Sequence, residues 1–179
     1  MMNIWHHIAK ERISPEDFAA CIEISSGSRN KYELDKQTGM LKLDRVLYTS
    51  MNYPANYGFI PRTYAADDDP LDVLVLCEEA IHPMTLVQCY PIGVVMMTDG
   101  DSADEKIIAV PFGDPSYNHY QDISELPRHV LDKIQHFLEF YKTLEGKPIK
   151  VGEPQGRDAA IEVIKSCLER YDRVFAGRV

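Results

Sequence analysis

The spacing of apolar residues changes along the chain, and this change constrains the fold more than any other feature of the sequence. Residues 73–77, 86–98 and 106–110 form apolar segments of strand length, which favours short strands in the first two thirds of the chain. Over residues 128–144 and 158–171, apolar residues recur three or four positions apart, which is the spacing of helices. A chain with strands in its first part and helices in its last part is expected to fold as an α+β domain. We predict a small barrel flanked by helices.

Three further strands are predicted in the first 50 residues, over residues 21–25, 31–35 and 40–48. Apolar and polar residues alternate over residues 21–25, which puts Ile22 and Ile24 on one face of a strand. In the next alternating segment, Lys31 and Glu33 share a face. The stretch between the two segments is rich in Ser, Gly and Asn, which is typical of a turn.

Size, charge and cysteine content limit the class of protein. The chain of 179 residues fits a single domain, residues 1–179. Its net charge of −9 opposes nucleic-acid binding, and no apolar run approaches the ~20 residues that span a bilayer. The N-terminus lacks the apolar stretch of a secretory signal, and the four cysteines form no Cys-x-x-Cys pair. We therefore expect a cytoplasmic protein without a zinc site.

The acidic run at residues 67–72, Asp-Asp-Asp-Pro-Leu-Asp, leads directly into an apolar strand. Pro70 stiffens the turn that carries these carboxylates, so they repel one another unless a cation offsets their charge. A solvated acidic turn is the alternative, but a second acidic segment, residues 99–105, also lies beside an apolar strand. Neither segment matches an EF-hand calcium loop, and oxygen ligands suit Mg²⁺ or Mn²⁺ better than zinc or copper.

A phosphate substrate also needs cationic and hydroxyl donors. The candidate donors are Lys31, Arg45, Lys106, Lys142, Tyr53, Tyr57 and Tyr141. Tyr141 extends the apolar stripe of its helix, so packing is its alternative role. The sequence contains neither a Walker P-loop nor a G-x-G-x-x-G motif, which argues against a nucleotide-binding fold of those types.

The acidic run is one of several short motifs that follow one another in a fixed order. Residues 67–73 read D-x-D-P-x-D-V. The other motifs are residues 22–24, 30–35, 44–45, 53–61, 97–99 with Asp104 and Lys106, and 136–142. In sequence and order, these motifs resemble those of the family I inorganic pyrophosphatases, from about residue 15 to about residue 170.

The resemblance implies a closed five-stranded OB-like β-barrel with flanking C-terminal helices, Mg²⁺ as cofactor and pyrophosphate as substrate. The implied metal ligands are Asp67, Asp72, Asp99 and Asp104, with Glu33 and Glu23 at the edge of the site. The implied phosphate-binding residues are Lys31, Arg45, Tyr57, Lys106, Tyr141 and Lys142. Asp69 is the implied proton acceptor. Bacterial members are usually hexamers, so the resemblance also implies a homohexamer, and His136 matches a position near their subunit contacts.

The implied chemistry is direct hydrolysis. Two adjacent metals, with Asp72 as their shared ligand, lower the pKa of a bridging water and yield hydroxide near neutral pH. The hydroxide attacks one phosphorus in line while the cations spread the charge of the leaving phosphate, so no covalent intermediate forms.

One position departs from the family pattern. Many bacterial members carry a second acid directly after the residue that matches Asp99, whereas this chain has Gly100 followed by Asp101. Either Asp101 substitutes through a small loop shift, or this metal subsite is weaker.

Three alternative functions stay open at the level of the sequence. The first is a Mg²⁺-dependent phosphohydrolase that acts on an organic diphosphate. The second is a β-barrel module that binds nucleic acid, which the net charge of −9 opposes. The third is a non-catalytic module that binds divalent cations.

Overall fold

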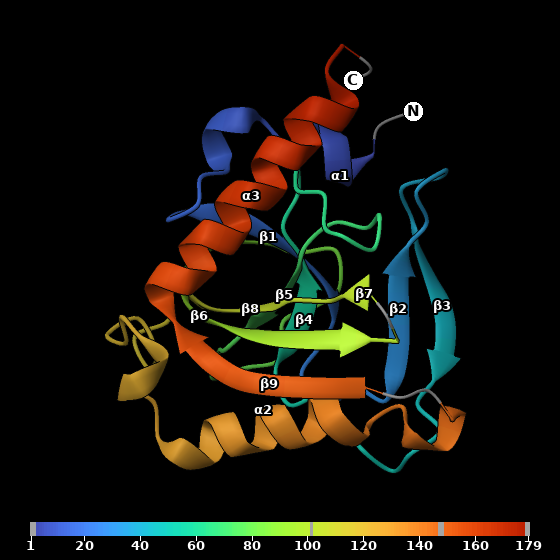
Figure 1. Ribbon diagram of the computed structural model, residues 1–179, viewed down its shortest axis with the longest axis vertical. Coiled ribbons are helices and arrows are strands. Elements are labelled where there is room, and N and C mark those ends of the chain that lie inside the picture. Colours follow the sequence, from blue (N-terminus) through green and yellow to red (C-terminus); the bar gives the residue numbers. More distant parts are fainter. Residues whose placement is uncertain (1–2, 101, 147–148, 178–179) are drawn as a thin grey trace.

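The computed structural model describes residues 3–100, 102–146 and 149–177 (Figure 1). The strands are β1 (Phe18–Ile24), β2 (Asn30–Leu34), β3 (Leu41–Val46), β4 (Asn56–Phe59), β5 (Asp72–Val75), β6 (Leu86–Asp99), β7 (Ser102–Ala103), β8 (Lys106–Pro111) and β9 (Ile149–Gly156). The α-helices are α1 (Ile4–His7), α2 (Arg128–Phe140) and α3 (Arg157–Phe175), and the 3₁₀ turns are η1 (Lys10–Arg12), η2 (Ile123–Glu125) and η3 (Thr143–Glu145). In the described part of the chain, no helix combines the length and the apolar character needed to cross a membrane.

Five strands pair in a closed ring. The order is β1–β4–β5–β8–β6, and β6 pairs back to β1. The β5–β8 pair is parallel, whereas the other four pairs of the ring are antiparallel. The long strand β6 also pairs with β9 and β7, and β2 and β3 form a separate hairpin beside the ring (Figure 1).

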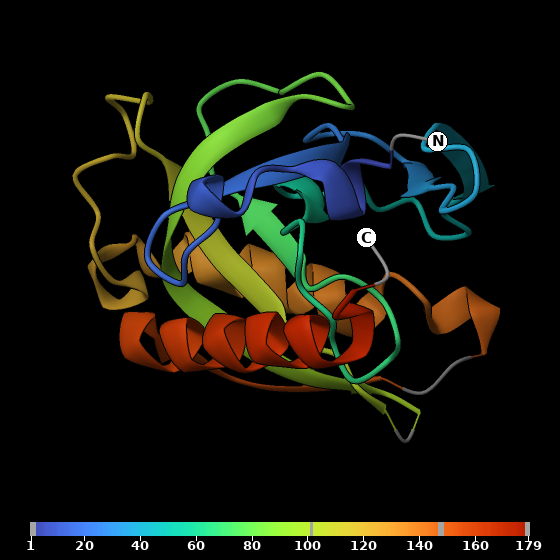
Figure 2. The same ribbon diagram turned by 90° about the horizontal axis from the view of Figure 1, so that it is seen from above.

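The ring strands bury both of their faces, which explains their continuous apolar runs. Along β5, Val73 and Val75 belong to a core cluster with the α3 residues Ala160 and Ile164. Leu74 points the other way, into a cluster that includes the apolar stripe of α2. α3 therefore covers the side chains on one face of β5, and α2 covers those on the other face. Figure 2 shows α3 along one side of the strands, with its last turns directed toward the N-terminal segment.

The α+β architecture predicted from the sequence is confirmed, with differences in detail. Between Pro91 and Gly93, the pairing of β6 with β8 shifts register, as expected of a bulge at a proline and a glycine. The prediction that Ile22 and Ile24 share a face is wrong, because the pairing of β1 with β4 shifts register between them. Ile22 therefore packs in the α3 cluster and Ile24 in the α2 cluster.

Three strands, β4, β7 and β9, are absent from the sequence-based prediction, and α2 is shorter than predicted. The helical pattern continues to residue 144, but α2 ends at Phe140 and a 3₁₀ turn, η3, follows. Gly146 ends that turn with a φ of 70°, a left-handed conformation that glycine adopts easily. Pro148, which follows in the sequence, lies outside the described residues.

Candidate active site

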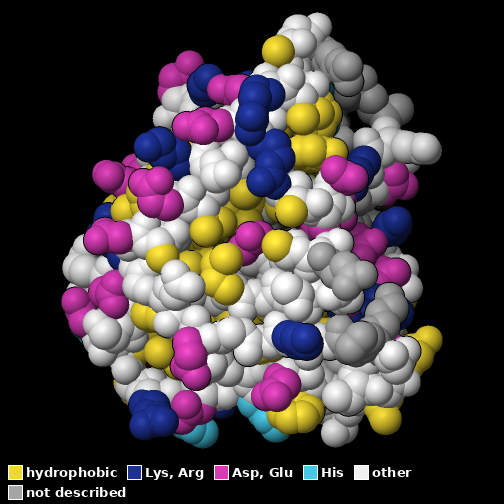
Figure 3. Space-filling view, viewed as in Figure 1, with side chains coloured by type: hydrophobic (Ala, Val, Ile, Leu, Met, Phe, Trp, Pro, Cys, Tyr) yellow, Lys and Arg dark blue, Asp and Glu magenta, His cyan; other side chains and the backbone are white. Residues whose placement is uncertain are grey.

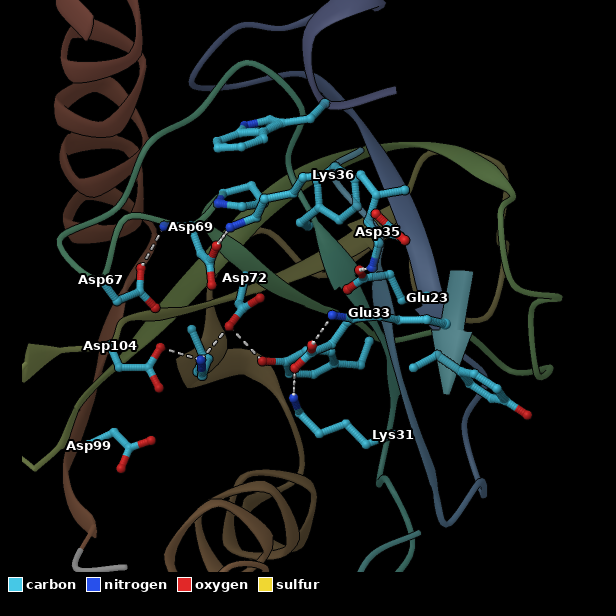
Figure 4. Close-up of a pocket in the computed structure, with 18 of the residues that line it drawn as sticks. Glu23, Lys31, Glu33, Asp35, Lys36, Asp67, Asp69, Asp72, Asp99 and Asp104 are labelled. Carbon is cyan, nitrogen blue, oxygen red and sulfur yellow. Dashed lines mark hydrogen bonds and ion pairs between the residues drawn. The ribbon is translucent and has the colours of Figure 1, made fainter. Parts of the chain in front are cut away.

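A cavity of about 630 Å³ lies where the β2–β3 hairpin faces the acidic turn 67–72. The site residues predicted from the sequence line this cavity, with the exception of Arg45 and of Tyr53, which is buried in the core. The lining residues that the sequence predicts are Glu23, Lys31, Glu33, Tyr57, Asp67, Asp69, Asp72, Asp99, Asp104, Lys106, Tyr141 and Lys142. Acidic and basic side chains are interspersed over this face of the molecule (Figure 3), and in Figure 4 the aspartates of the turn face Lys31 and Glu33 of β2.

Tyr57, Asp72, Asp104 and Lys106 form the deepest group of polar side chains, which we call the floor cluster. The parallel register of β5 and β8 puts Asp72 opposite Lys106. The ammonium of Lys106 is 2.5 Å from Asp72 Oδ2 and also contacts Asp104 Oδ1. Tyr57 donates its hydroxyl to Asp72 Oδ2 at 2.7 Å. Because strands carry three of these four residues, the cluster has a rigid frame.

Lys106 is only 2% exposed, so its charge depends on its two partners. Burial acts to lower the pKa of Lys106, but the charges of Asp72 and Asp104 outweigh burial and hold that pKa above its ordinary value. The same burial raises the pKa of Asp104, although the ammonium of Lys106 opposes that rise. The floor cluster is therefore an arrangement in which two carboxylates share one cation.

Two further carboxylates bind protons more tightly than usual. Burial raises the pKa of Asp67 to about 6, and the charges of Asp72 and Asp104 add to the rise. Burial also raises the pKa of Glu23 to about 8, with Asp72 as the second cause, while a hydrogen bond from Leu34 N at 2.7 Å opposes the rise. Carboxylates that repel one another in a buried site are stabilised by a proton or by a metal cation.

Two ion pairs lie nearer to solvent, and we call them the rim pairs. The first joins Lys31 to Glu33, and Lys31 is also 3.2 Å from Asp44. The second joins Lys36 of the β2–β3 turn to Asp69 of the acidic turn, as Figure 4 shows. The side chains of Lys36 and Asp69 are both about half exposed. The rim pairs are thus more accessible to solvent than the floor cluster.

The end of α2 supplies the last part of the cavity wall. Because α2 stops at Phe140, the chain turns and directs Lys142 to Asp99, with 2.5 Å between the ammonium and Oδ2. Tyr141 lines the cavity, and its ring also stacks on Phe137 in the core. Asp99 precedes Gly100, whose φ of 63° is left-handed. A side chain at this position would be strained, which gives a physical reason for the glycine there. Asp101 lies outside the described residues.

Arg45 does not line the cavity, and here the structure differs from the sequence-based expectation. Its Nε donates to Glu145 Oε1 at 2.9 Å, and its Nη1 contacts Asp44. Its Nη2 is buried and has no hydrogen-bond partner among the described residues. The guanidinium is therefore held at the side of the site by Glu145 and Asp44, with one donor unused.

Sequence reasoning missed several residues of the cavity wall. They are Trp5, Tyr32, Leu34, Asp35, Lys36, Gln37, Lys42, Phe59 and Pro70. Lys36 directly follows the motif at residues 30–35, so its position in the sequence was an available signal. Trp5 carries no such signal, because only the folded chain brings it to the cavity.

The carboxylates of the cavity suit a hard cation such as Mg²⁺, because all of their donor atoms are oxygens. Within residues 3–100, 102–146 and 149–177, no three His, Cys, Asp or Glu side chains converge closely enough to hold one ion as they lie. Several of these carboxylates are directed to lysines instead, and the ammonium of Lys106 takes the position of a cation between Asp72 and Asp104. The charge and the chemistry of the donor set therefore fit a divalent metal.

Comparisons with known proteins show to which family the chain belongs. A family model for inorganic pyrophosphatase matches residues 20–172. The inorganic pyrophosphatase of Halalkalibacterium halodurans is 46% identical over 159 residues, which cover 89% of this chain and 98% of that relative. Soluble inorganic pyrophosphatase 1 of Arabidopsis thaliana is 44% identical over 167 residues, which cover 93% of this chain and 79% of that relative.

The similar solved structures are also inorganic pyrophosphatases. The inorganic pyrophosphatase of Thermus thermophilus superposes with a TM-score of 0.91 at 41% identity, covering 96% of this chain and 99% of that one. The enzyme of Helicobacter pylori superposes with a TM-score of 0.86 at 44% identity, covering 89% of this chain and 95% of that one. Because similarity of this degree extends over nearly the whole of both chains, this chain belongs to the family I inorganic pyrophosphatases.

Proposed function

We propose that this protein is a Mg²⁺-dependent enzyme that hydrolyses pyrophosphate to two orthophosphates. The observation that carries this proposal is the cavity in which carboxylates alternate with lysines, since a site for a metal–diphosphate complex needs both charges side by side. The names of the relatives, all inorganic pyrophosphatases, support the choice of substrate.

The proposed metal ligands are carboxylates of the cavity. They are Asp67, Asp72, Asp99 and Asp104, with Glu33 and Glu23 at the edge. Mg²⁺ bound there supplies positive charge to the phosphate oxygens and lowers the pKa of the water that it binds. The raised pKa of Asp67 and of Asp104 supports this assignment, because each carboxylate is held where negative charge needs compensation.

The other side chains of the cavity hold the substrate and move the proton. Lys31, Lys106 and Lys142 carry the positive charge that pyrophosphate needs, and the hydroxyl groups of Tyr57 and Tyr141 lie in the same cavity. Asp69 is half exposed at the rim and is proposed to accept the proton of the attacking water. Arg45 reaches the substrate only after its guanidinium leaves Glu145.

The finer description of the fold is also a proposal. We propose that the five-stranded ring is a closed OB-like barrel, which is supported by the closed order of strand pairing. Such closure leaves no free edge within the ring and keeps the strands of the floor cluster in fixed register.

We further propose a cytoplasmic homohexamer. Three of the four cysteines are buried and none is in a disulfide, which fits a reducing compartment. Large apolar side chains are exposed on β3, at the end of α2 and in η3, and a contact between subunits would cover them. They are Leu43, Val46, Phe140 and Leu144. Analytical ultracentrifugation distinguishes a hexamer from a monomer directly.

The experiment that tests the proposed function is phosphate release from pyrophosphate. We expect release that requires Mg²⁺ and is suppressed by Ca²⁺, and much slower release from nucleoside diphosphates and other organic diphosphates. No release at millimolar Mg²⁺ and pyrophosphate would contradict the proposal. Faster release from an organic diphosphate would favour the phosphohydrolase alternative.

A further inference from the structure

The short helix α1 borders the cavity, although it lies before residue 20, where the family match begins. Its Trp5 is only 4% exposed and is one of the residues that line the cavity. In Figure 1, α1 lies beside the loop that follows β4 and carries the acidic turn. The N-terminal segment, defined here as residues 3–7, is therefore part of the wall of the site.

Trp5 is fixed to the backbone that supports the acidic turn. Its indole Nε1 donates to Thr63 O at 2.9 Å, and Arg62 N donates to Trp5 O at 2.9 Å. Thr63 is fully buried, and its hydroxyl accepts a hydrogen bond of 2.8 Å from Leu71 N, next to the last residue of the acidic turn. Trp5 and the acidic turn are thus anchored through the same residue.

The N-terminal segment also contacts Lys36 at both ends of that residue. Asn3 Nδ2 donates to Lys36 O at 2.8 Å, which ties the backbone of the β2–β3 turn to the segment. At the other end, the Lys36 ammonium lies 5.3 Å from the centre of the Trp5 ring, within the range of a cation–π contact. The same ammonium pairs with Asp69 Oδ1, as Figure 4 shows.

Trp5 also packs against α3. The ring of Phe175 meets the indole edge-on, with 5.4 Å between the centroids. The neighbouring His6 shares a hydrogen bond of 2.7 Å with the hydroxyl of Tyr171. Because α3 holds the segment from outside, the indole is a fixed surface against which the flexible Lys36 side chain can rest.

We propose that Trp5 and Lys36 are positioning residues, in which the N-terminal segment holds Lys36 and Lys36 holds the Asp69 carboxylate toward the cavity. This inference rests on the proposed function, because Asp69 is the proton acceptor there. A half-exposed carboxylate rotates freely unless a partner restrains it, and a small misplacement of an acid–base group slows the chemical step more than it weakens substrate binding.

The first test uses Lys36→Met with Lys10→Met as its control. Lys10 also lies near the N-terminus and forms an exposed ion pair of 2.9 Å, with Asp172 outside the cavity. We expect Lys36→Met to lower kcat about tenfold with KM changed less than about twofold, and Lys36→Arg to restore most of the rate. Lys10→Met should leave both constants unchanged. An unchanged kcat in Lys36→Met, with normal turnover by the wild type, would overturn the positioning role alone.

A double-mutant cycle tests whether Lys36 acts through Asp69. In the Asp69→Asn background, we expect Lys36→Met to lower kcat by less than about twofold, because the carboxylate that Lys36 positions is absent. A loss of about tenfold in both backgrounds would overturn the inference. If the wild type itself released no phosphate, the proposed function would fail, and the role of Lys36 with it.

Fluorescence supplies a readout that does not depend on activity. Trp5 is the only tryptophan of the chain, so the intrinsic emission reports on this contact. We expect Lys36→Met to change the emission intensity of the ligand-free protein, and Lys10→Met to leave it unchanged. Methylenediphosphonate is an analogue of pyrophosphate that cannot be hydrolysed. Together with Mg²⁺, it should shift the emission in the wild type. Equal emission from Lys36→Met and the wild type would show that the lysine does not rest on the indole, which overturns the inference.

Discussion

The floor cluster and the rim pairs use the same kinds of side chain but differ in what holds them. In the floor cluster, Lys106 and Asp72 lie opposite each other on paired strands and are largely withdrawn from water. In the more exposed of the rim pairs, Lys36 and Asp69 come from two turns and are half exposed. A buried charge that loses its partner is left without compensation, whereas an exposed charge is solvated by water. Substitutions in the floor cluster should therefore have the larger effects.

The largest effect is expected for Asp72→Asn. This change removes the carboxylate that Lys106 and Tyr57 share, and with it a proposed Mg²⁺ ligand, so we expect kcat/KM to fall about 10³-fold or more. Phosphate release at saturating Mg²⁺ measures the change. Asp35→Asn is the matched control, since Asp35 also lines the cavity but accepts from the backbone of its own turn. A loss of less than about tenfold in Asp72→Asn would remove the distinction between floor and rim.

Asp69→Asn is expected to have the next largest effect. The proposed proton acceptor is lost while the floor cluster is unchanged, so kcat should fall about 10²-fold and Mg²⁺ binding, followed by calorimetry, should persist. Asp68→Asn provides the control in the same turn, because Asp68 is exposed and its carboxylate contacts the Tyr64 hydroxyl rather than lining the cavity. Equal rates for Asp69→Asn and the wild type would exclude Asp69 as the proton acceptor.

The sequence predicts which residues form the rim pairs and the floor cluster better than it predicts their contacts. The spacing of apolar residues predicts α2 and α3, and the motifs predict most of the cavity wall. The position of Lys106 opposite Asp72 depends on the parallel register of β5 and β8, which no local pattern encodes. The contact between Lys36 and Trp5 depends on the packing of the N-terminal segment against α3. These features arise from long-range packing, so they require the structure.

β9 and Arg45 are two further cases in which local sequence does not predict the contacts of a residue or segment. β9 contains glycines and a proline that read as a loop, but pairing with β6 stabilises it as a strand. Arg45 carries the right charge for phosphate, and only the fold brings it next to Glu145, which is 8% exposed in its side chain. Local sequence thus predicts which chemical groups are present more reliably than which partner each group meets.

A smaller effect is expected for Glu145→Gln. Binding of phosphate by Arg45 competes with the Arg45–Glu145 pair, so weakening that pair should lower KM about threefold at unchanged kcat. Arg45→Met should raise KM by a larger factor, which tests whether the guanidinium contacts the substrate at all. Steady-state kinetics of the two variants give both values. A higher KM in Glu145→Gln would instead mean that Glu145 orients Arg45 for binding.

The smallest effect concerns stability rather than rate, and Glu23 is the residue that reports it. Its pKa is about 8 in the folded protein, well above the ordinary value of 4.5, so folding takes up a proton. Its stabilising contribution is complete below the unfolded pKa and is lost as the pH rises through about 8. In EDTA, the Tm of the wild type should therefore fall as the pH rises from about 5 to about 8.5.

Glu23→Gln should flatten this dependence, because the amide keeps an oxygen for Leu34 N but carries no charge. At about pH 8.5, we expect its Tm to exceed that of the wild type by about 3 °C or more, as measured by differential scanning calorimetry. The exposed Glu11→Gln is the control and should follow the wild type. Mg²⁺ should raise the Tm of the wild type at this pH, since a cation then compensates the carboxylates. A Tm for Glu23→Gln that fell as steeply as that of the wild type would show that Glu23 does not hold its proton in the folded state.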